Sequence, residues 1–312
     1  MVHNKLVSII IPIYNEEEGV QALIKDITDY HLSRKFDFEI IFVNDGSVDF
    51  TYQKILQHRP LLFPSKLINL SKNFGAHAAV RAGFKVAEGS FTTCVPADLQ
   101  ISFDAIEVLF FRALEGFDVV YGVREVKDAG FFGKMFSRTY ARLMQKHVNK
   151  DFPFKGLETL LINEKVKDAF NENIESNSSV FLQALSIGFN KSFVDIKKEE
   201  RKTGKSKWTM SSKIKLLIDS FVAFSYFPIR LVSVVGISFF MIGFIWTFYV
   251  IVRKFLFDDI VSGWPALTSI LLVGFGVTNI GLGIVAEYLW RTLDSSRKRP
   301  VFIIDEIVKL ND

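Results

Sequence analysis

Asp98 and Gln100 are the two side chains whose type and spacing most directly suggest chemistry. The apolar run 90–95 predicts a strand and residues 102–114 predict a helix, so both side chains lie on a loop where a strand ends. Ligands collect at the carboxyl ends of strands in open α/β sheets. Residues two apart can face the same side of an extended loop, and paired oxygens suit Mg or Mn that phosphates also hold. The alternative is a turn that begins a helix, with Asp98 or Ser102 as its cap.

Three further strand ends carry polar residues in the same way. The predicted strands are Leu6–Ile11, Phe38–Val43 and Leu67–Leu70, and the polar stretches after them are 12–18, 44–49 and 71–75. A helical pattern follows each stretch, and this alternation predicts a doubly wound, mostly parallel α/β sheet with right-handed crossovers. The acidic residues 16–18 would also suit a helix N-terminus, which is the alternative interpretation. No Gly-x-Gly-x-x-Gly follows the first strand and no Gly-x-x-x-x-Gly-Lys-Ser/Thr loop is present, which argues against a dinucleotide Rossmann site and a P-loop NTPase.

The composition suggests a membrane part. The chain has 312 residues and a formal net charge of +4, and its mean hydropathy of +0.24 is high for a soluble domain. The single cysteine, Cys94, excludes an internal disulfide framework and a multi-cysteine zinc site, and its apolar strand predicts a small core residue. The mild positive charge gives no argument for nucleic acid. Because no signal peptide precedes the first strand, we expect the N-terminal part in the cytoplasm.

Four motifs carry a resemblance to a known family. They are Ile-Pro-Ile-Tyr-Asn-Glu-Glu (11–17), Val-Asn-Asp-Gly-Ser-Val-Asp (43–49), Leu-Ser-Lys-Asn-Phe-Gly (70–75) and Ala-Asp-Leu-Gln (97–100). In this order, each at a strand end, they resemble family 2 glycosyltransferases, and most of all the branch that transfers a sugar to polyprenyl phosphate. The resemblance implies a GT-A nucleotide-sugar domain.

The resemblance also implies roles for individual residues. The base and ribose of the donor, a UDP-sugar by preference or a GDP-sugar, would be bound by Pro12, Tyr14, Glu16, Asp45 and Ser47. Asp98 would be catalytic and would also contact the donor, and with Gln100 it would hold Mg or Mn on the diphosphate. The sequence departs from the family here, because Pro96 and Ile101 replace the first and last carboxylates of Asp-Ala-Asp-Leu-Gln-Asp. Donor phosphates and water can still complete the metal shell, with weaker affinity. The alternative is a catalytically impaired membrane scaffold of the same fold.

The middle of the chain offers candidate acceptor residues. A predicted strand, 118–121, leads to Arg124, and a basic, aromatic helix containing Arg138 follows. The resemblance implies that both arginines contact phosphate; the alternative for the helix is an ordinary amphipathic helix with a solvated basic face. Glu158 stands where the family carries an acidic residue taken as the base. A phosphate monoester has a second pKa near ~6 and is already a dianion, so Glu158 need only orient the acceptor. A solvent-facing carboxylate is the alternative.

A basic loop follows a predicted strand at 193–196. It resembles the family's Arg-x-x-Gly-x-Ser-Lys loop, in which Arg201, Ser206 and Lys207 would bind the diphosphate and the lipid phosphate as a lid. A solvated charged loop is the alternative.

The C-terminal third predicts membrane attachment. Residues 211–228 read as an amphipathic interfacial helix, and 229–252 and 264–290 as two transmembrane spans, with Trp264 and Trp290 as interface anchors. Buried helices of a soluble core are the alternative. The balance of Lys and Arg puts both ends in the cytoplasm. Residues 300–305 predict a strand that returns to the catalytic domain.

These observations predict four parts: a cytoplasmic GT-A domain (1–210), an interfacial helix (211–228), a two-helix transmembrane hairpin (229–291) and a cytoplasmic tail with a strand (292–312). The predicted activity is inverting, metal-assisted transfer of one sugar to polyprenyl (undecaprenyl) phosphate at the cytoplasmic face of the inner membrane. The resembled type also implies a homotetramer. A processive polysaccharide synthase would need more spans and a Gln-x-x-Arg-Trp helix, and the sequence shows neither. A channel would need a polar pathway, which the two predicted spans lack.

Overall fold

The structure, a computed structural model, describes residues 5–98, 100–124, 131–147, 149–173, 179–197, 263–296 and 300–311, with isolated positions between 232 and 256. The chain divides into two compact units, Met1–Lys215 with Pro300–Asp312, and Leu216–Arg299. The candidate site residues that the structure describes all belong to the first unit.

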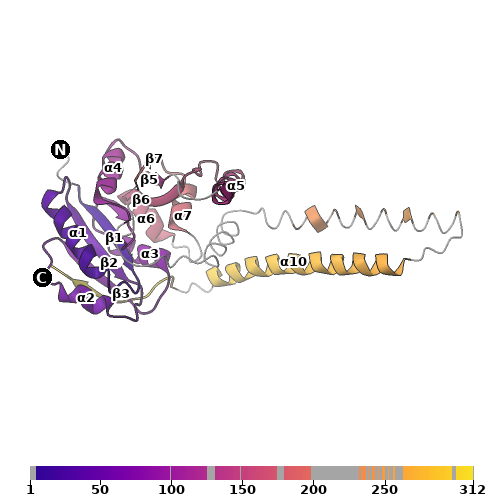
Figure 1. The fold of residues 1–312 in the computed structure, drawn as a ribbon, viewed down its shortest axis with the longest axis horizontal. Helices are drawn as coiled ribbons and strands as arrows, with labels where there is room; N and C mark the ends of the chain where they lie inside the picture. The colour runs from indigo at the N-terminus through magenta and orange to yellow at the C-terminus, as the bar shows by residue number, and fades with distance from the viewer. Residues whose placement is uncertain are drawn as a thin grey trace. The chain divides into compact units, whose positions relative to one another are not determined.

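The first unit is built on an eight-stranded sheet in the order β7-β5-β6-β4-β1-β2-β3-β8 (Figure 1). The strands are β1 (Val7–Ile13), β2 (Phe38–Asn44), β3 (Ser65–Leu70), β4 (Phe91–Cys94), β5 (Val119–Arg124), β6 (Gly156–Asn163), β7 (Lys191–Asp195) and β8 (Ile304–Lys309). Neighbours are parallel from β3 through β2 and β1 to β4, whereas β6 and β8 run antiparallel to their neighbours. The predicted α/β class with a mostly parallel sheet is confirmed.

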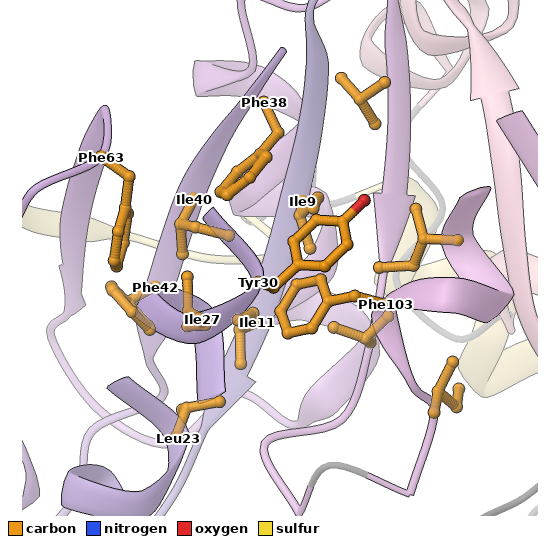
Figure 2. Close-up of a cluster of buried hydrophobic side chains, with 14 of the residues drawn as sticks. Ile9, Ile11, Leu23, Ile27, Tyr30, Phe38, Ile40, Phe42, Phe63 and Phe103 are labelled. Carbon is orange, nitrogen blue, oxygen red and sulfur yellow. The ribbon is translucent and has the colours of Figure 1, made fainter. Parts of the chain in front are cut away.

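Helices cover both faces of the parallel strands, which is why these strands are apolar throughout. One face packs against α1 (Val20–Ser33), α2 (Thr51–Gln57) and α4 (Phe103–Leu114). Figure 2 shows this cluster, in which the rings of Tyr30 and Phe103 stack with centroids 4.6 Å apart. The other face packs against α3 (Ala76–Val86), where a Cβ on Gly83 would come within 2.5 Å of Ile10. The first unit also contains the helices α5 (Phe131–His147), α6 (Glu164–Glu172) and α7 (Val180–Ser186).

Pro12 lies inside β1, although the sequence predicted that it would end the strand. It pairs with Val43 of β2, and β1 continues to Ile13. Pairing with β4 ends two residues before Pro12, at Ile10 and Cys94. Since Pro12 has no N–H to donate, it is tolerated where the neighbouring strand has already left the ladder.

Two strands differ from the sequence prediction. The sequence prediction contained no strand around Glu158, but residues 156–163 form β6, which inserts antiparallel between β4 and β5. The C-terminal strand forms, but at Ile304–Lys309 instead of 300–305, and pairs antiparallel with β3.

The second predicted span coincides with a single helix, α10 (Trp264–Ser296). In the part of the chain that the structure describes, no helix combines the length and apolarity required to cross a bilayer. The segments 201–207 and 211–228, and most of 229–252, lie outside the described residues. The interfacial helix and the two spans therefore stay predictions.

Candidate active site

The loops that follow β1 and β2 interlock. Asn15, with a φ of 51°, donates its backbone N–H to Ser47 Oγ (3.0 Å), and its own Oδ1 accepts from the N–H of Val48 (2.9 Å). The backbone N–H of Glu16 donates to Thr51 Oγ1 (2.9 Å). The structure thus places three of the predicted donor-binding residues, Tyr14, Glu16 and Ser47, on one hydrogen-bonded double loop at the carboxyl edge of the sheet. Tyr14 is 37% exposed, and Pro12, Glu16 and Ser47 are half-buried.

Asp45 binds the loop after β3 to the loops after β1 and β2. Its carboxylate oxygens accept the backbone N–H groups of Phe74 (2.7 Å) and Gly75 (2.9 Å), and only 3% of the residue is exposed. Burial raises the pKa of the Asp45 carboxyl, although both hydrogen bonds act in the opposite direction. The carboxylate predicted to bind the base therefore also clamps the loop after β3.

Gly46 is required at this junction. Its φ is 62°, and a Cβ there would lie 2.3 Å from the carbonyl carbon of Lys72. Any larger residue would separate the loop after β2 from the loop after β3.

Asp98 and Gln100 follow β4, as predicted. The backbone N–H of Gln100 donates to Asp98 Oδ1 (3.2 Å), which turns the loop tightly. Ser102, not Asp98, caps α4, because Ser102 Oγ accepts from the N–H of Ala105 (3.3 Å). The half-buried Asp98 is thus not needed as a helix cap.

The same loop offers few ligands to a divalent cation. Among the described residues, no three His, Cys, Asp or Glu side chains are grouped so that they could hold a metal. The protein's own contribution would be one carboxylate and one amide, from Asp98 and Gln100. These hard oxygen donors fit Mg or Mn only if donor phosphates and water supply the remaining ligands.

Glu158 and Arg124, predicted separately as the acidic residue and a phosphate ligand, form an ion pair, Nε to Oε1 2.7 Å. The register of β5 and β6 passes from Gly122 opposite Thr159 to Val123 opposite Leu157, so it steps over Glu158. Such a bulge bends the strand and re-aims the extra side chain, and bulges are enriched beside active sites. Both side chains are partly buried, with 28% of Arg124 and 18% of Glu158 exposed.

Thr159 connects this bulge to β4, the strand that precedes Asp98. Ladder pairing between β4 and β6 ends at Thr93 and Leu161, and beyond it Thr159 Oγ1 donates to the carbonyl of Cys94 (2.6 Å). This hydrogen bond satisfies the buried carbonyl at the end of β4. Burial raises the pKa of the Cys94 thiol to about 12. Cys94 is a core residue, as predicted.

The remaining predicted phosphate ligands are not assembled by the described structure. Arg138 is exposed on α5, and Arg201, Ser206 and Lys207 lie outside the described residues. Their roles stay predictions.

Sequence reasoning missed two asparagines that hold the loop after β2. Asn44 ends β2, 2% exposed, and its Oδ1 accepts the N–H of Ser47 (3.3 Å). Asn69, in β3, accepts from Asn44 Nδ2 (2.7 Å). The available signal was an amide at or near the end of an otherwise apolar strand, because a buried amide requires partners.

Comparison with known proteins identifies the family. The family model described as glycosyl transferase family 2 matches residues 8–173. The uncharacterized glycosyltransferase YkcC of Bacillus subtilis is 32% identical over 96% of this chain and 93% of its own length. The undecaprenyl-phosphate 4-deoxy-4-formamido-L-arabinose transferase of Aeromonas hydrophila is 30% identical over 98% of this chain and 94% of its own. The putative glycosyltransferase CsbB of Bacillus subtilis is 32% identical over 96% and 92%. This chain belongs to glycosyl transferase family 2, and it is a glycosyltransferase.

Proposed function

We propose that this enzyme transfers a single sugar from a nucleotide-sugar donor to polyprenyl phosphate, with inversion at the anomeric carbon. The observation that carries the proposal is the match to the undecaprenyl-phosphate transferase of Aeromonas hydrophila, which spans 98% of this chain. The family model ends at residue 173. The relative therefore matches the C-terminal region as well, where a lipid acceptor would have to be bound.

The donor would occupy the carboxyl edge of β1, β2 and β4. Tyr14, Glu16 and Ser47 lie on the interlocked loops there, and Asp45 holds the next loop in place. A UDP-sugar is the first candidate and a GDP-sugar the second. Asp98 and Gln100 would hold Mg or Mn, which when bound neutralises charge on the departing diphosphate.

The acceptor phosphate would be bound beside Arg124. One of its oxygens forms the new bond to the anomeric carbon, and the bond from that carbon to the diphosphate oxygen breaks, releasing the nucleoside diphosphate. The acceptor is a dianion above its second pKa near ~6, so no proton has to be removed. Glu158 then serves by holding the Arg124 guanidinium in place, which is the kind of positioning on which such a transfer depends.

The reaction would take place at the cytoplasmic face of the inner membrane. Residues 211–228 would lie in the interface, and 229–252 and 264–290 would anchor the enzyme. Large apolar side chains exposed on α10, among them Leu267, Phe275 and Leu289, support contact with lipid. Arg138, Arg201, Ser206 and Lys207 would bind the phosphate groups of the donor and the lipid, and Arg201→Ala should weaken acceptor binding.

Mass spectrometry of lipid extracts from cells with and without the protein tests the proposal. A polyprenyl phosphate carrying one hexose-sized sugar should accumulate with the wild type and be absent with Asp98→Asn. If the two lipid profiles are identical, transfer is refuted. Donor hydrolysis in vitro then separates a misassigned acceptor from the scaffold alternative, because a scaffold would release no nucleoside diphosphate.

A further inference from the structure

A continuous relay of hydrogen bonds, made by side chains and by two backbone N–H groups, runs from β8 to the loops after β2 and β1. Asn69 Nδ2 donates to Asp305 Oδ2 (3.3 Å), and Asn44 Nδ2 donates to Asn69 Oδ1 (2.7 Å). Asn44 Oδ1 accepts the N–H of Ser47 (3.3 Å), and Ser47 Oγ accepts the N–H of Asn15 (3.0 Å). The relay therefore spans β8, β3, β2 and the loop after β1.

The relay begins at a second bulge. Pairing between β3 and β8 passes from Asn69 opposite Glu306 to Leu70 opposite Ile304, so the register steps over Asp305. A bulge re-aims the extra side chain, and here the carboxylate of Asp305 meets the amide of Asn69. The backbone secures the same region, because Ser71 donates its N–H to the carbonyl of Ile303 (3.1 Å).

The two ends of the relay determine which way the amides of Asn44 and Asn69 are turned. The backbone N–H of Ser47 can only donate, and the carboxylate of Asp305 can only accept. Asn44 must therefore turn its oxygen to Ser47 and its nitrogen to Asn69. Asn69 in turn must present its oxygen to Asn44 and its nitrogen to Asp305. Every donor in the sequence meets an acceptor in only this orientation.

The burial of the relay decides where it matters most. Asn44 is 2% exposed, Asn69 is partly buried and Asp305 is exposed. An unsatisfied donor or acceptor at the buried Asn44 cannot bond to water instead, so it costs more free energy than the same unsatisfied group at the surface. The inner half of the relay contacts the loop after β2, and the outer half, which ends at Asp305, favours the same orientation of both amides.

We propose that Asn44 and Asn69 are positioning residues for donor binding, oriented by Asp305 from the C-terminal strand. The inference rests on the proposed function, because it assumes that the loop 45–48 contacts the donor nucleotide. Formation of β8 and the shape of the donor site are then coupled. Neither asparagine is required to touch the substrate.

Swapping an acid and an amide along the relay tests this directly. In Asn44→Asp the Asn69 amide faces carboxylates on both sides and can donate to only one. Adding Asp305→Asn restores a complete relay, because Asn69 turns over, donates to residue 44 and accepts from residue 305. Asp305→Asn alone keeps an acceptor for Asn69. The double variant has the same net charge as the wild type.

Equilibrium binding of UDP with Mn²⁺ to the purified full chain is the first measurement. Asn44→Asp should bind about tenfold more weakly, the loss expected for one unsatisfied buried contact. Asp305→Asn should stay within about threefold, and the double variant should recover most of the loss. Glu306→Gln, added to Asn44→Asp in place of Asp305→Asn, removes the same charge from β8 away from the relay and should not rescue.

A second single variant and its double variant provide the same test if Asn44→Asp does not fold. Asn69→Asp keeps the bond from Asn44 but sets two carboxylates against each other, and Asp305→Asn should again rescue it. Rescue of either single variant supports the relay. Wild-type affinity in both single variants, or double variants no better than the singles, overturns it.

Hydrogen–deuterium exchange of the peptide 44–50, in the chain without nucleotide, tests the relay independently of the proposed donor binding. Exchange should rise in Asn44→Asp and fall back in the double variant. If the wild type binds neither UDP nor GDP, the proposed donor chemistry fails, and the exchange pattern still decides for or against the relay.

Discussion

Arg124 and Glu158 lie 2.7 Å apart, Nε to Oε1, at the bulge between β5 and β6. The sequence assigned one to the acceptor phosphate and the other to the role of base. The ion pair makes them a single unit, since the carboxylate occupies one N–H of a guanidinium that has five. A phosphate could be bound by the others while Glu158 fixes the plane of the group.

Glu158→Gln should therefore leave the enzyme active. We expect transfer to fall by no more than about tenfold, mainly through a higher acceptor KM, with an unchanged pH profile between pH 6 and 8. Stability should change by less than about 1 kcal/mol, because the pair is partly exposed. Steady-state kinetics of the variant beside Arg124→Lys provides the comparison. A loss of about a thousandfold or more, with the pH profile displaced, would identify Glu158 as a true base.

Asp98→Asn should abolish transfer. The substitution keeps the size of the side chain but removes the only charge that the described loop offers a metal, and we expect a loss of at least about a hundredfold. Initial rates in the presence of Mn²⁺ measure it. Asp104→Asn is the matched control, because Asp104 lies in the first turn of α4 and should keep near wild-type activity. Full activity of Asp98→Asn would reject the metal role.

Asp45→Ala should destabilise the protein. It leaves the backbone N–H groups of Phe74 and Gly75 without the carboxylate, and each lost partner costs about 1–2 kcal/mol in a buried site. Asp45→Asn keeps one acceptor and should lose about half as much. Urea unfolding measures the free energy of unfolding of both variants, and Asp45→Ala should be the less stable of the two. Wild-type stability of Asp45→Ala would mean that the clamp contributes nothing to folding.

The positions of the proposed donor-binding residues in the fold could be predicted, because these residues lie where strands end. Polar residues after an apolar run locate the carboxyl edge of a parallel sheet, and this principle placed Tyr14, Ser47 and Asp98 on the same edge. It could not show that Asp45 uses both oxygens on the backbone of residues 74 and 75, because that contact requires β3 to lie beside β2.

The directions of Glu158, in the proposed acceptor site, and of Asp305, in the relay, were less predictable, because bulges depend on the register of two strands. Glu158 and Asp305 owe their directions to positions that their partner strands skip. No local pattern in one strand carries this information. The insertion of β6 between β4 and β5 was hidden for the same reason, since its sequence alone does not state which strands it will join.

His77 should contribute to the loss of folding stability at acidic pH. Burial in the first place, and then the neighbouring Arg81, lowers the pKa of His77 to about 4. Between that value and the usual pKa near ~6.5, the unfolded chain binds more protons than the folded one, so stability falls as the pH falls. We expect His77→Gln to lose about 2 kcal/mol less than the wild type between pH 7 and pH 4.5.

Urea midpoints at both pH values measure this difference. The exposed His58, replaced by Gln, is the control and should follow the wild type. Equal acid sensitivity in His77→Gln and the wild type would show that His77 does not resist protonation in the folded state.

The central claim is sugar transfer to a lipid phosphate, and one reaction tests it most directly. The purified full-length protein in detergent is incubated with undecaprenyl phosphate, Mn²⁺ and a panel of radiolabelled UDP- and GDP-sugars, and the lipid phase is counted. At least one donor should label the lipid with the wild type and none with Asp98→Asn. If no donor labels the lipid although the protein is folded, the proposed reaction is contradicted.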